Sequence, residues 1–278
     1  MNLIDNDAIK RHSAVRFRSE YHYAVFEYWR SAKLLQWLRL AGIEHLGHVL
    51  DDGCGGGGMC VSLGEETDHV VGIDLNDRFR DAGTRLAQER GVNNVTYVRA
   101  DGCRLPFPDR TFDTVLSHAV IEHISDYGTY LHEARRVMRS DGHLFLQTAP
   151  YLSPHGSHIP RLKIPIPLHL IIGRRAAFAV TRWIAAHRPT WFHGPPEGSS
   201  FLTAARLGKV KIDDVLYFVT VRNLRQAIRD AGFRIVREDL HVSGLVRRYF
   251  PENIQALVPG TPLARDILIT NMEYLLVT

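Results

Sequence analysis

The stretch HVLDDGCGGGG at residues 48–58 decides the fold. Two apolar residues lead into the carboxylates of Asp51 and Asp52, and a glycine-rich turn follows directly. Glycine accepts positive φ and lets a ligand approach the backbone, so five glycines within six positions indicate a binding turn rather than a plain surface turn. The mostly apolar residues 59–63 predict a helix, whose first N–H groups would point at a bound ligand. We therefore expect a buried strand, a tight turn and a helix N-terminus.

Composition narrows the class of protein. A chain of 278 residues with 45% hydrophobic residues can fill one large α/β domain, or a core domain with an insertion. No apolar stretch is long enough to span a membrane, and the N-terminus lacks the pattern of a signal peptide. Cys54, Cys60 and Cys103 lack metal-type spacing and indicate reduced thiols. We expect a cytoplasmic protein whose net charge of +4 suits an anionic ligand or a membrane surface without indicating nucleic acid.

Short apolar segments alternate with amphipathic ones along the chain. A first helix is expected at residues 21–41, and a second directly after the glycines. We then expect strands at 48–51, 69–74, 95–98, 112–116 and 142–148, with helices at 77–90 and 127–138. Later come a helix at 221–230, a strand starting at 233–236 and a closing strand at 272–277. This alternation predicts βαβ units and a parallel α/β sheet.

The same pattern divides the chain into four parts. They are an N-terminal helical segment (1–46), a core segment (47–150), an inserted cap (151–215) and the C-terminal part of the core (216–278). The cap segment is rich in proline and holds nine Lys or Arg against three acidic residues. A loop this long is usually functional or disordered, and its aromatic residues argue against disorder. We interpret it as a cover over the sheet edge that selects the substrate, or alternatively as a dimer contact.

Three expected strands each end in or lead to a carboxylate: Asp51, Asp74 and Asp101. Parallel sheets bind ligands at the carboxyl ends of their strands, so these acids should share one edge. Such an edge suits a nucleoside with hydroxyl and amino groups and a cationic head, whereas it would repel a pyrophosphate. The spacing of Gly53, Gly55 and Gly58 also fits G-x-G-x-x-G, so an NAD(P)-binding oxidoreductase stays an alternative.

The ordered motifs of this region resemble those of the class I S-adenosylmethionine-dependent methyltransferases. VLDDGCGGG at 49–57 resembles the first motif of the family, and VGID at 71–74 its second-strand acid. DGCRLPFPDRTFD at 101–113, IEHI at 121–124 and EARRVMRSDG at 133–142 are similar to the segments that run through the fourth and fifth strands. The chain departs from the pattern at Asp52, where the family usually has an apolar residue, and at Gly56.

The resemblance implies an enzyme with a Rossmann-like, doubly wound sheet that is mostly parallel with an antiparallel last strand. It also implies S-adenosylmethionine as cofactor and a set of cofactor-binding residues. That set comprises Asp51, Gly53, Cys54, Gly55, Gly57, Asp74, Leu75, Asp101, Gly102, Cys103 and Ser117. Within it the glycines would line the methionine part, Asp74 the ribose hydroxyls and Asp101 the adenine amino group. The sequence leaves open whether Asp51 or Asp52 faces the amino group of the methionine part.

Histidines are the candidate catalytic residues. Transfer to a hydroxyl needs a base that removes its proton as the new bond forms, and histidine suits this near neutral pH. His123 lies in the segment after the fourth expected strand that faces acceptors in the family, and His118, just past that strand, would by the same resemblance lie beneath the sulfonium. For His123 a structural role is the alternative, because Glu-His recurs in relatives with different substrates.

His155 and His158 open the cap segment and are candidate substrate-binding residues. They could also act as a base, form a metal pair or be solvated loop residues. Glu122 and Asp126 lie nearby in the sequence, but no ligand set is evident, so we predict no metal site.

The sequence therefore predicts methyl transfer to a small molecule, a sugar or a lipid-linked glycan, at a hydroxyl with a histidine base. The basic and apolar cap suits such an acceptor near a membrane surface, and no basic stripe with interleaved aromatics indicates nucleic acid. A homodimer through the cap is an alternative use of that segment. A relative that binds the cofactor without catalysis is the remaining alternative.

Overall fold

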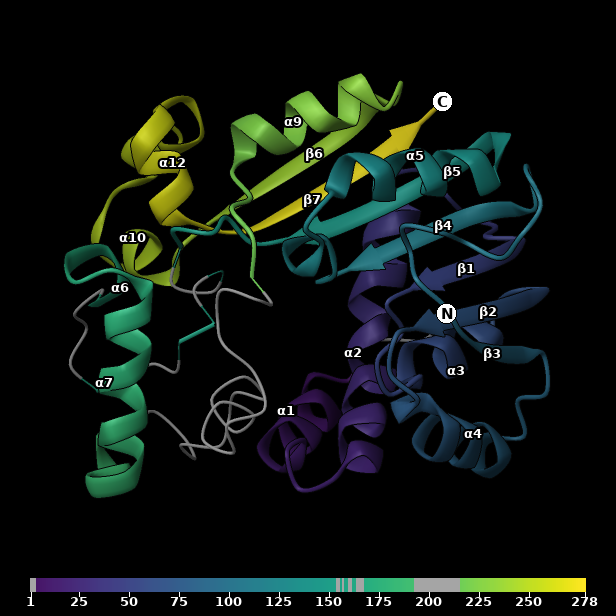
Figure 1. Ribbon diagram of the computed structural model, residues 1–278, viewed down its shortest axis with the longest axis horizontal. Helices are drawn as coiled ribbons and strands as arrows, with labels where there is room; N and C mark the ends of the chain where they lie inside the picture. Colours follow the sequence, from purple (N-terminus) through teal and green to yellow (C-terminus); the bar gives the residue numbers. More distant parts are fainter. Residues whose placement is uncertain (1–3, 154–155, 157, 160–161, 164–167, 193–215) are drawn as a thin grey trace.

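The structure is a computed structural model that describes residues 4–153, 156, 158–159, 162–163, 168–192 and 216–278. The described residues form a seven-stranded sheet of order β3-β2-β1-β4-β5-β7-β6 (Figure 1). Its strands are β1 (His48–Asp52), β2 (His69–Asp74), β3 (Val95–Arg99), β4 (Phe112–His118), β5 (Met138–Thr148), β6 (Arg234–Val242) and β7 (Ile269–Val277). β1 to β5 run parallel, and β7 pairs antiparallel with β5 and β6. The predicted sheet, with its antiparallel last strand, is confirmed.

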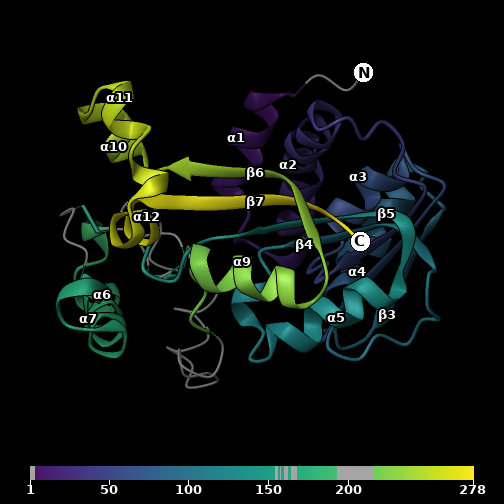
Figure 2. The same cartoon turned by 90° about the horizontal axis from the view of Figure 1, so that it is seen from above.

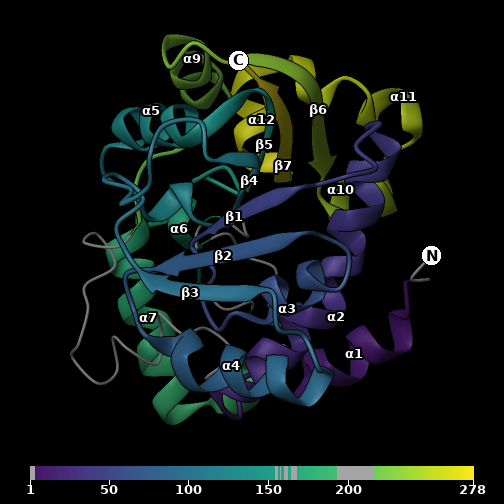
Figure 3. The same ribbon diagram turned by 90° about the vertical axis from the view of Figure 1, so that its right-hand side faces the viewer.

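Helices cover both faces of the sheet (Figures 2 and 3). One face carries α1 (Asn6–Val15), α2 (Glu20–Leu40), α3 (Gly58–Gly64) and α4 (Arg78–Arg90), and the other carries α5 (Tyr127–Val137) and α9 (Val221–Asp230). Successive residues of a strand point to opposite faces. Val49 accordingly packs in the core on the α2 side, and Leu50 packs in the core on the α5 side. A central strand that is buried on both faces reads as a continuous apolar run, as the sequence indicated.

Capping side chains explain helices that periodicity missed. The pattern predicts no helix before residue 21, but Asp5 accepts a hydrogen bond from the Ala8 N–H at 2.8 Å and starts α1. It also predicts no element between the strand that starts at 233–236 and the strand at 272–277, where the structure has α10 (Gly244–Tyr249), α11 (Glu252–Gln255) and α12 (Pro262–Leu268). The Ser243 side chain caps α10, and Pro262 occupies the first turn of α12. These helices are too short for a periodic pattern to reveal them.

The cap segment is described in part. It contains α6 (Leu168–Ile171), α7 (Arg174–His187) and a 3₁₀ turn at Pro189–Trp191, and α7 lies beyond the end toward which β1 and β4 point (Figure 1). Phe178 and Ile184 of α7 pack with Phe192 in a small core of their own. His155 and the stretch 193–215 lie outside the described residues. Within the described part of the chain, none of the helices could cross a membrane.

Candidate functional site

The predicted carboxylates meet at one edge of the sheet. Asp51 and Asp52 close β1, Asp74 closes β2, and Asp101 follows the end of β3. These three strands are neighbours in the sheet and run in the same direction. Their carboxyl ends therefore share an edge, as the sequence predicted, and the four acids surround the start of the glycine turn.

The glycine turn has a conformation that requires glycine. Gly53, Gly55 and Gly57 have φ values of 87°, 56° and 80°, which L side chains rarely adopt. The turn is anchored below, because the N–H groups of Gly53 and Cys54 both donate to the Ile73 carbonyl at 2.8 Å. It is held from the side by Asp74, whose Oδ2 accepts from the Gly55 N–H at 3.0 Å. One carboxylate therefore positions the turn at the same edge where the ligand would bind.

Asp51 and Asp52 point to opposite faces of the sheet, as neighbours in a strand must. Asp51 faces α3, where its Oδ2 accepts a weak hydrogen bond from the Cys60 thiol at 3.1 Å. Burial, together with the nearby Asp74 charge, raises the pKa of Asp51 to about 6, although the Cys60 hydrogen bond and the charge of Arg30 oppose the shift. The α3 side is also the side of α2, which carries Arg30.

Asp52 lies on the α5 side. An added Cβ at Gly102 would lie 2.7 Å from its Oδ1, so only glycine fits at that position. Its Oδ2 is buried and has no hydrogen-bond partner among the described residues. Burial, together with the charges of Asp51 and Asp101, raises the pKa of Asp52 to about 8. The carboxyl group is therefore mostly protonated at neutral pH.

Asp74 and Asp101 remain accessible at the rim. The Oδ1 of Asp74 accepts from the Asn76 N–H at 2.8 Å, and the Oδ1 of Asp101 accepts from the Cys103 N–H at 2.9 Å. Leu75, directly after Asp74, is an apolar residue that is 55% exposed. An exposed Leu directly after Asp74 offers a hydrophobic contact for the base of a nucleoside, near acceptors for ribose hydroxyl groups and a base amino group.

Other residues of the predicted cofactor set have structural contacts instead of open side chains. Ser117 is fully buried, and its Oγ accepts from the Tyr130 hydroxyl at 2.8 Å. The Cys54 side chain is buried in the α2-side core. Burial raises the pKa of the Cys103 thiol to about 11, so it stays protonated. At these positions a ligand could contact the backbone or pack against the side chain.

His118 ends β4 beside Arg30 of α2. The Arg30 Nη2 lies 3.4 Å from the His118 Nδ1. Burial, and then the charge of Arg30, lowers the pKa of His118 to about 3. The imidazole is therefore neutral at physiological pH and has little capacity to take up a proton. Arg30 was missed from the sequence, because the aromatic spacing of its helix indicated a core helix.

Glu122, His123 and His158 come together just beyond β4. Each offers one potential ligating atom, and these atoms lie within 4.8 Å of one another. The rings of His123 and His158 are T-shaped with centroids 5.2 Å apart, and Glu122 Oε2 accepts from the Thr148 hydroxyl at 2.7 Å. Burial raises the pKa of Glu122, while the charge of His123 lowers it. The sequence did not reveal this set, because His158 reaches it from the start of the cap segment.

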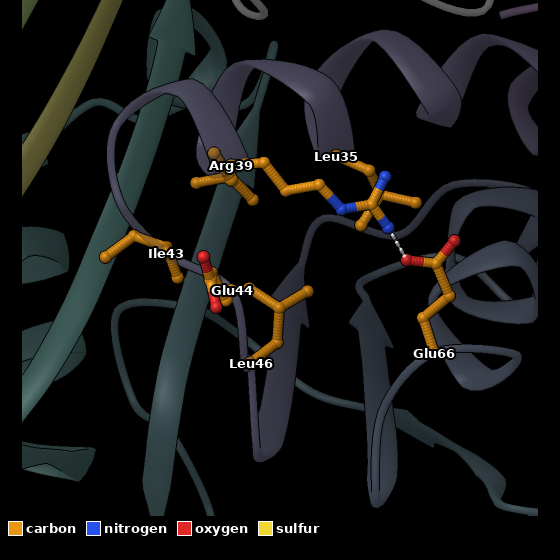
Figure 4. Close-up of a pocket in the computed structure, with 7 residues that line it drawn as sticks. Leu35, Arg39, Ile43, Glu44, Leu46 and Glu66 are labelled. Atoms are coloured by element: carbon orange, nitrogen blue, oxygen red, sulfur yellow. Dashed lines mark hydrogen bonds and ion pairs between the residues drawn. The ribbon is translucent and has the colours of Figure 1, made fainter. Parts of the chain in front are cut away.

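The hollow in Figure 4 lies at the opposite edge of the sheet. It encloses only about 10 Å³ and lies between the end of α2 and Leu46, just before β1 begins. An ion pair between Arg39 and Glu66 crosses it (Figure 4). The amino edge of the sheet thus has no room for a ligand at this hollow, in contrast to the carboxyl edge.

Comparison with known proteins places this geometry in context. Residues 50–146 match the profile of a family described as "Methyltransferase domain". An uncharacterized methyltransferase of Mycolicibacterium vanbaalenii is 34% identical over 173 residues, which cover 62% of this chain and 63% of that protein. The uncharacterized methyltransferase YcgJ of Bacillus subtilis is 31% identical over 127 residues, 44% of this chain and 49% of that protein. The chain thus spans about half the length of the first curated relatives it matches.

Solved structures share the fold. The crystal structure of an S-adenosylmethionine dependent methyltransferase from Mesorhizobium loti superposes with a TM-score of 0.51 at 18% identity. The superposition covers 87% of this chain and 95% of that one. The similarity therefore extends beyond the matched residues 50–146, and at this identity it speaks for the fold alone.

Proposed function

We propose that the protein methylates a small-molecule, sugar or lipid-linked acceptor at a hydroxyl. The premise is that residues 50–146 are a methyltransferase domain of the class that uses S-adenosylmethionine. The observation that carries this proposal is the cluster of carboxylates around a glycine turn. Asp51, Asp74 and Asp101 lie at or just after the carboxyl ends of three neighbouring parallel strands, at the sheet edge where the glycine turn begins. A ligand with a cationic sulfonium, ribose hydroxyls and an adenine amino group matches these acceptors.

The residues present fit this cofactor. The left-handed φ values of Gly53, Gly55 and Gly57 require glycine, and the space beside Gly53 and Gly57 is taken by the Val120 and Tyr97 side chains, so a methionine moiety would lie against the backbone of the turn on the side that these two residues leave open. Asp74 would accept from the ribose hydroxyls and Asp101 from the adenine amino group, with Leu75 against the base. Negative charges next to the turn disfavour the pyrophosphate of NAD. We assign the methionine amino group to Asp51, which shares its face with α3.

The chemistry requires one proton acceptor. When bound, S-adenosylmethionine supplies an electrophilic methyl group on its sulfonium and leaves as neutral S-adenosylhomocysteine. As the acceptor oxygen forms its bond to that methyl group and the S–CH₃ bond breaks, the hydroxyl proton must go to a base. We assign this role to His123, because the neighbouring Glu122 carboxyl would stabilise the imidazolium that forms. His118 is a poor candidate, because a pKa of about 3 makes its imidazole a weak base, and we assign it to hydrogen bonding.

Ligand-induced stabilisation and methyl transfer test the proposal together. S-adenosylhomocysteine at about 100 times its Kd should add about 2.7 kcal/mol of stability, and so raise Tm by roughly 5–10 °C. NAD at the same concentration should cause no shift. Radiolabelled methyl transfer to a panel of hydroxylated acceptors then separates an enzyme from a non-catalytic relative. A shift with NAD alone would favour the oxidoreductase alternative and refute the proposal.

A further inference from the structure

A cavity of about 590 Å³ lies between α2 and the sheet. On the sheet side it is bounded at the carboxyl ends of β4, β5 and β6 and at the start of β7. Its volume falls in the range of pockets that bind small molecules. Asp74, Asp101 and the glycine turn are not part of its lining, so the cavity is separate from the proposed adenosine site.

The sheet wall of this cavity is polar where a packed interface would be apolar. His118 pairs with Gln147, Gln147 with Glu273, and Asn271 with His241, so these side chains share the α2 face of the sheet. On the same face but deeper in the sheet, Phe145 and Leu275 belong to the apolar core. The change from apolar to polar residues coincides with the cavity, which indicates a surface made for a ligand rather than for α2.

Two buried polar atoms of cavity-lining residues have no partner. Gln147 donates its amide to Asn271, but its Oε1 accepts from no group among the described residues. The Nε of Arg30, on the α2 wall, is buried and likewise unpaired in the described part of the chain. A buried polar atom without a hydrogen bond is costly, so both side chains would gain a partner by turning toward a ligand in the cavity that supplies one donor and one acceptor. The Oε1 of Gln147 is a hydrogen-bond acceptor, and the Nε of Arg30 is a charged donor.

Charge and shape restrict the ligand further. Lys33 joins Arg30 on the α2 wall. The Glu273 carboxylate opposite is already engaged, by His241 Nε2 at 2.8 Å and by the Asn271 amide at 2.9 Å. Arg30 Nη2 also lies 3.9 Å from Glu27 Oε1, a distance that makes this a loose ion pair, so Arg30 together with Lys33 can still serve an anionic ligand. Trp37 and Phe145 supply an aromatic wall, with ring centroids 5.1 Å apart.

We propose that this cavity binds the anionic end of the methyl acceptor, and that the acceptor is a small hydroxylated carboxylic acid with an apolar or aromatic body. Arg30 and Lys33 hold the carboxylate, and Gln147 Oε1 accepts from a hydroxyl. The cavity reaches Ala119, and His123 follows in the next turn of the chain without lining the cavity, so the acceptor has to extend beyond the cavity to meet the proposed base. This assignment rests on the proposed methyltransferase function and names its substrate class.

Calorimetric titration with 3,4-dihydroxycinnamate tests the assignment, using the full chain saturated with S-adenosylhomocysteine. The methyl ester of the same acid has the same ring without the charge, and inorganic phosphate has a charge without the ring. We expect the ester to bind at least 10-fold more weakly than the acid, and phosphate more weakly still. Equal binding of acid and ester, or no binding of the acid, would overturn the proposal.

Variants locate the site. Arg30→Gln and Lys33→Gln should each weaken the acid about 10-fold and leave the ester unchanged, whereas Gln147→Leu should weaken both. Lys10→Gln, an exposed lysine of α1 that does not line the cavity, is the matched control and should change neither. Wild-type affinity in all three cavity variants would overturn the assignment. If S-adenosylhomocysteine itself fails to bind, the proposed function falls, and the acceptor site falls with it. If S-adenosylhomocysteine binds and the acid does not, only the acceptor site falls, so the two failures can be told apart.

Discussion

Replacing Asp52 by Asn should make the stability of the protein less dependent on pH. Asp52 is buried beside the Asp51 and Asp101 charges, and its pKa is raised from 3.8 to about 8. In the unfolded chain the same carboxyl ionises near its ordinary value. A group whose pKa is higher in the folded state contributes stability that is complete below about pH 4 and is lost as the pH rises toward about 8.

The size of the Asp52 contribution to stability follows from this pH window. Each pH unit in which the unfolded chain is ionised and the folded protein is protonated lowers the free energy of unfolding by about 1.4 kcal/mol. Between pH 6 and pH 8 the Asp52 contribution should fall by about 2 kcal/mol, because the loss levels off near the folded pKa. Asp51, with its pKa raised to about 6, has lost most of its own contribution below this interval. The change in the free energy of unfolding over this pH interval therefore depends on Asp52 far more than on Asp51.

Urea unfolding at pH 6, 7 and 8 measures the effect. The wild-type protein should lose about 2 kcal/mol more over this interval than Asp52→Asn does. Asp68→Asn, which removes an exposed carboxylate at the start of β2, is the control for the loss of one charge. Identical pH slopes for the wild-type protein and Asp52→Asn would show that Asp52 is ionised in the folded state and would refute the reasoning.

Three further outcomes are expected. Asp74→Ala should weaken binding of S-adenosylhomocysteine by about 1–3 kcal/mol in calorimetry, because ribose hydroxyls lose their acceptor; an unchanged Kd would remove Asp74 from the site. His123→Gln should lower kcat by about 10²–10⁴-fold with cofactor affinity intact, while the exposed control His132→Gln keeps full activity; an active His123→Gln enzyme would exclude it as the base. EDTA should leave the rate unchanged, since we assign the proton to His123; a loss that Zn²⁺ or Mg²⁺ restores would assign Glu122, His123 and His158 to a metal instead.

The fold could be predicted because its signals are local. A buried strand, a glycine turn and a helix start follow one another within residues 48–64, and the same alternation repeats down to β5. The family resemblance read from residues 48–150 is confirmed by the match over residues 50–146. The acids Asp51, Asp74 and Asp101 could be placed at one edge because parallel strands carry their carboxyl ends to the same side. Short helices such as α10 and α11 escaped, since capping rather than periodicity starts them.

The rest of the site depends on contacts between residues distant in the sequence. Gln147 and Asn271 are 124 positions apart, and their pairing depends on the antiparallel insertion of β7 beside β5. Arg30 becomes part of a site only because α2 crosses the carboxyl half of the sheet. Likewise, His158 meets His123 only through the path of the cap segment. Residue types and their spacing in the sequence carry no information about these contacts.

A crystal structure of the complex with S-adenosylhomocysteine is the most direct test of the central claim that acids at one sheet edge hold the cofactor around the glycine turn. We predict the ribose hydroxyls on the Asp74 carboxylate, the adenine amino group on Asp101, and the amino-acid part against Gly53, Gly55 and Gly57. A ligand bound elsewhere, or an adenosine that contacts neither Asp74 nor Asp101, would contradict it.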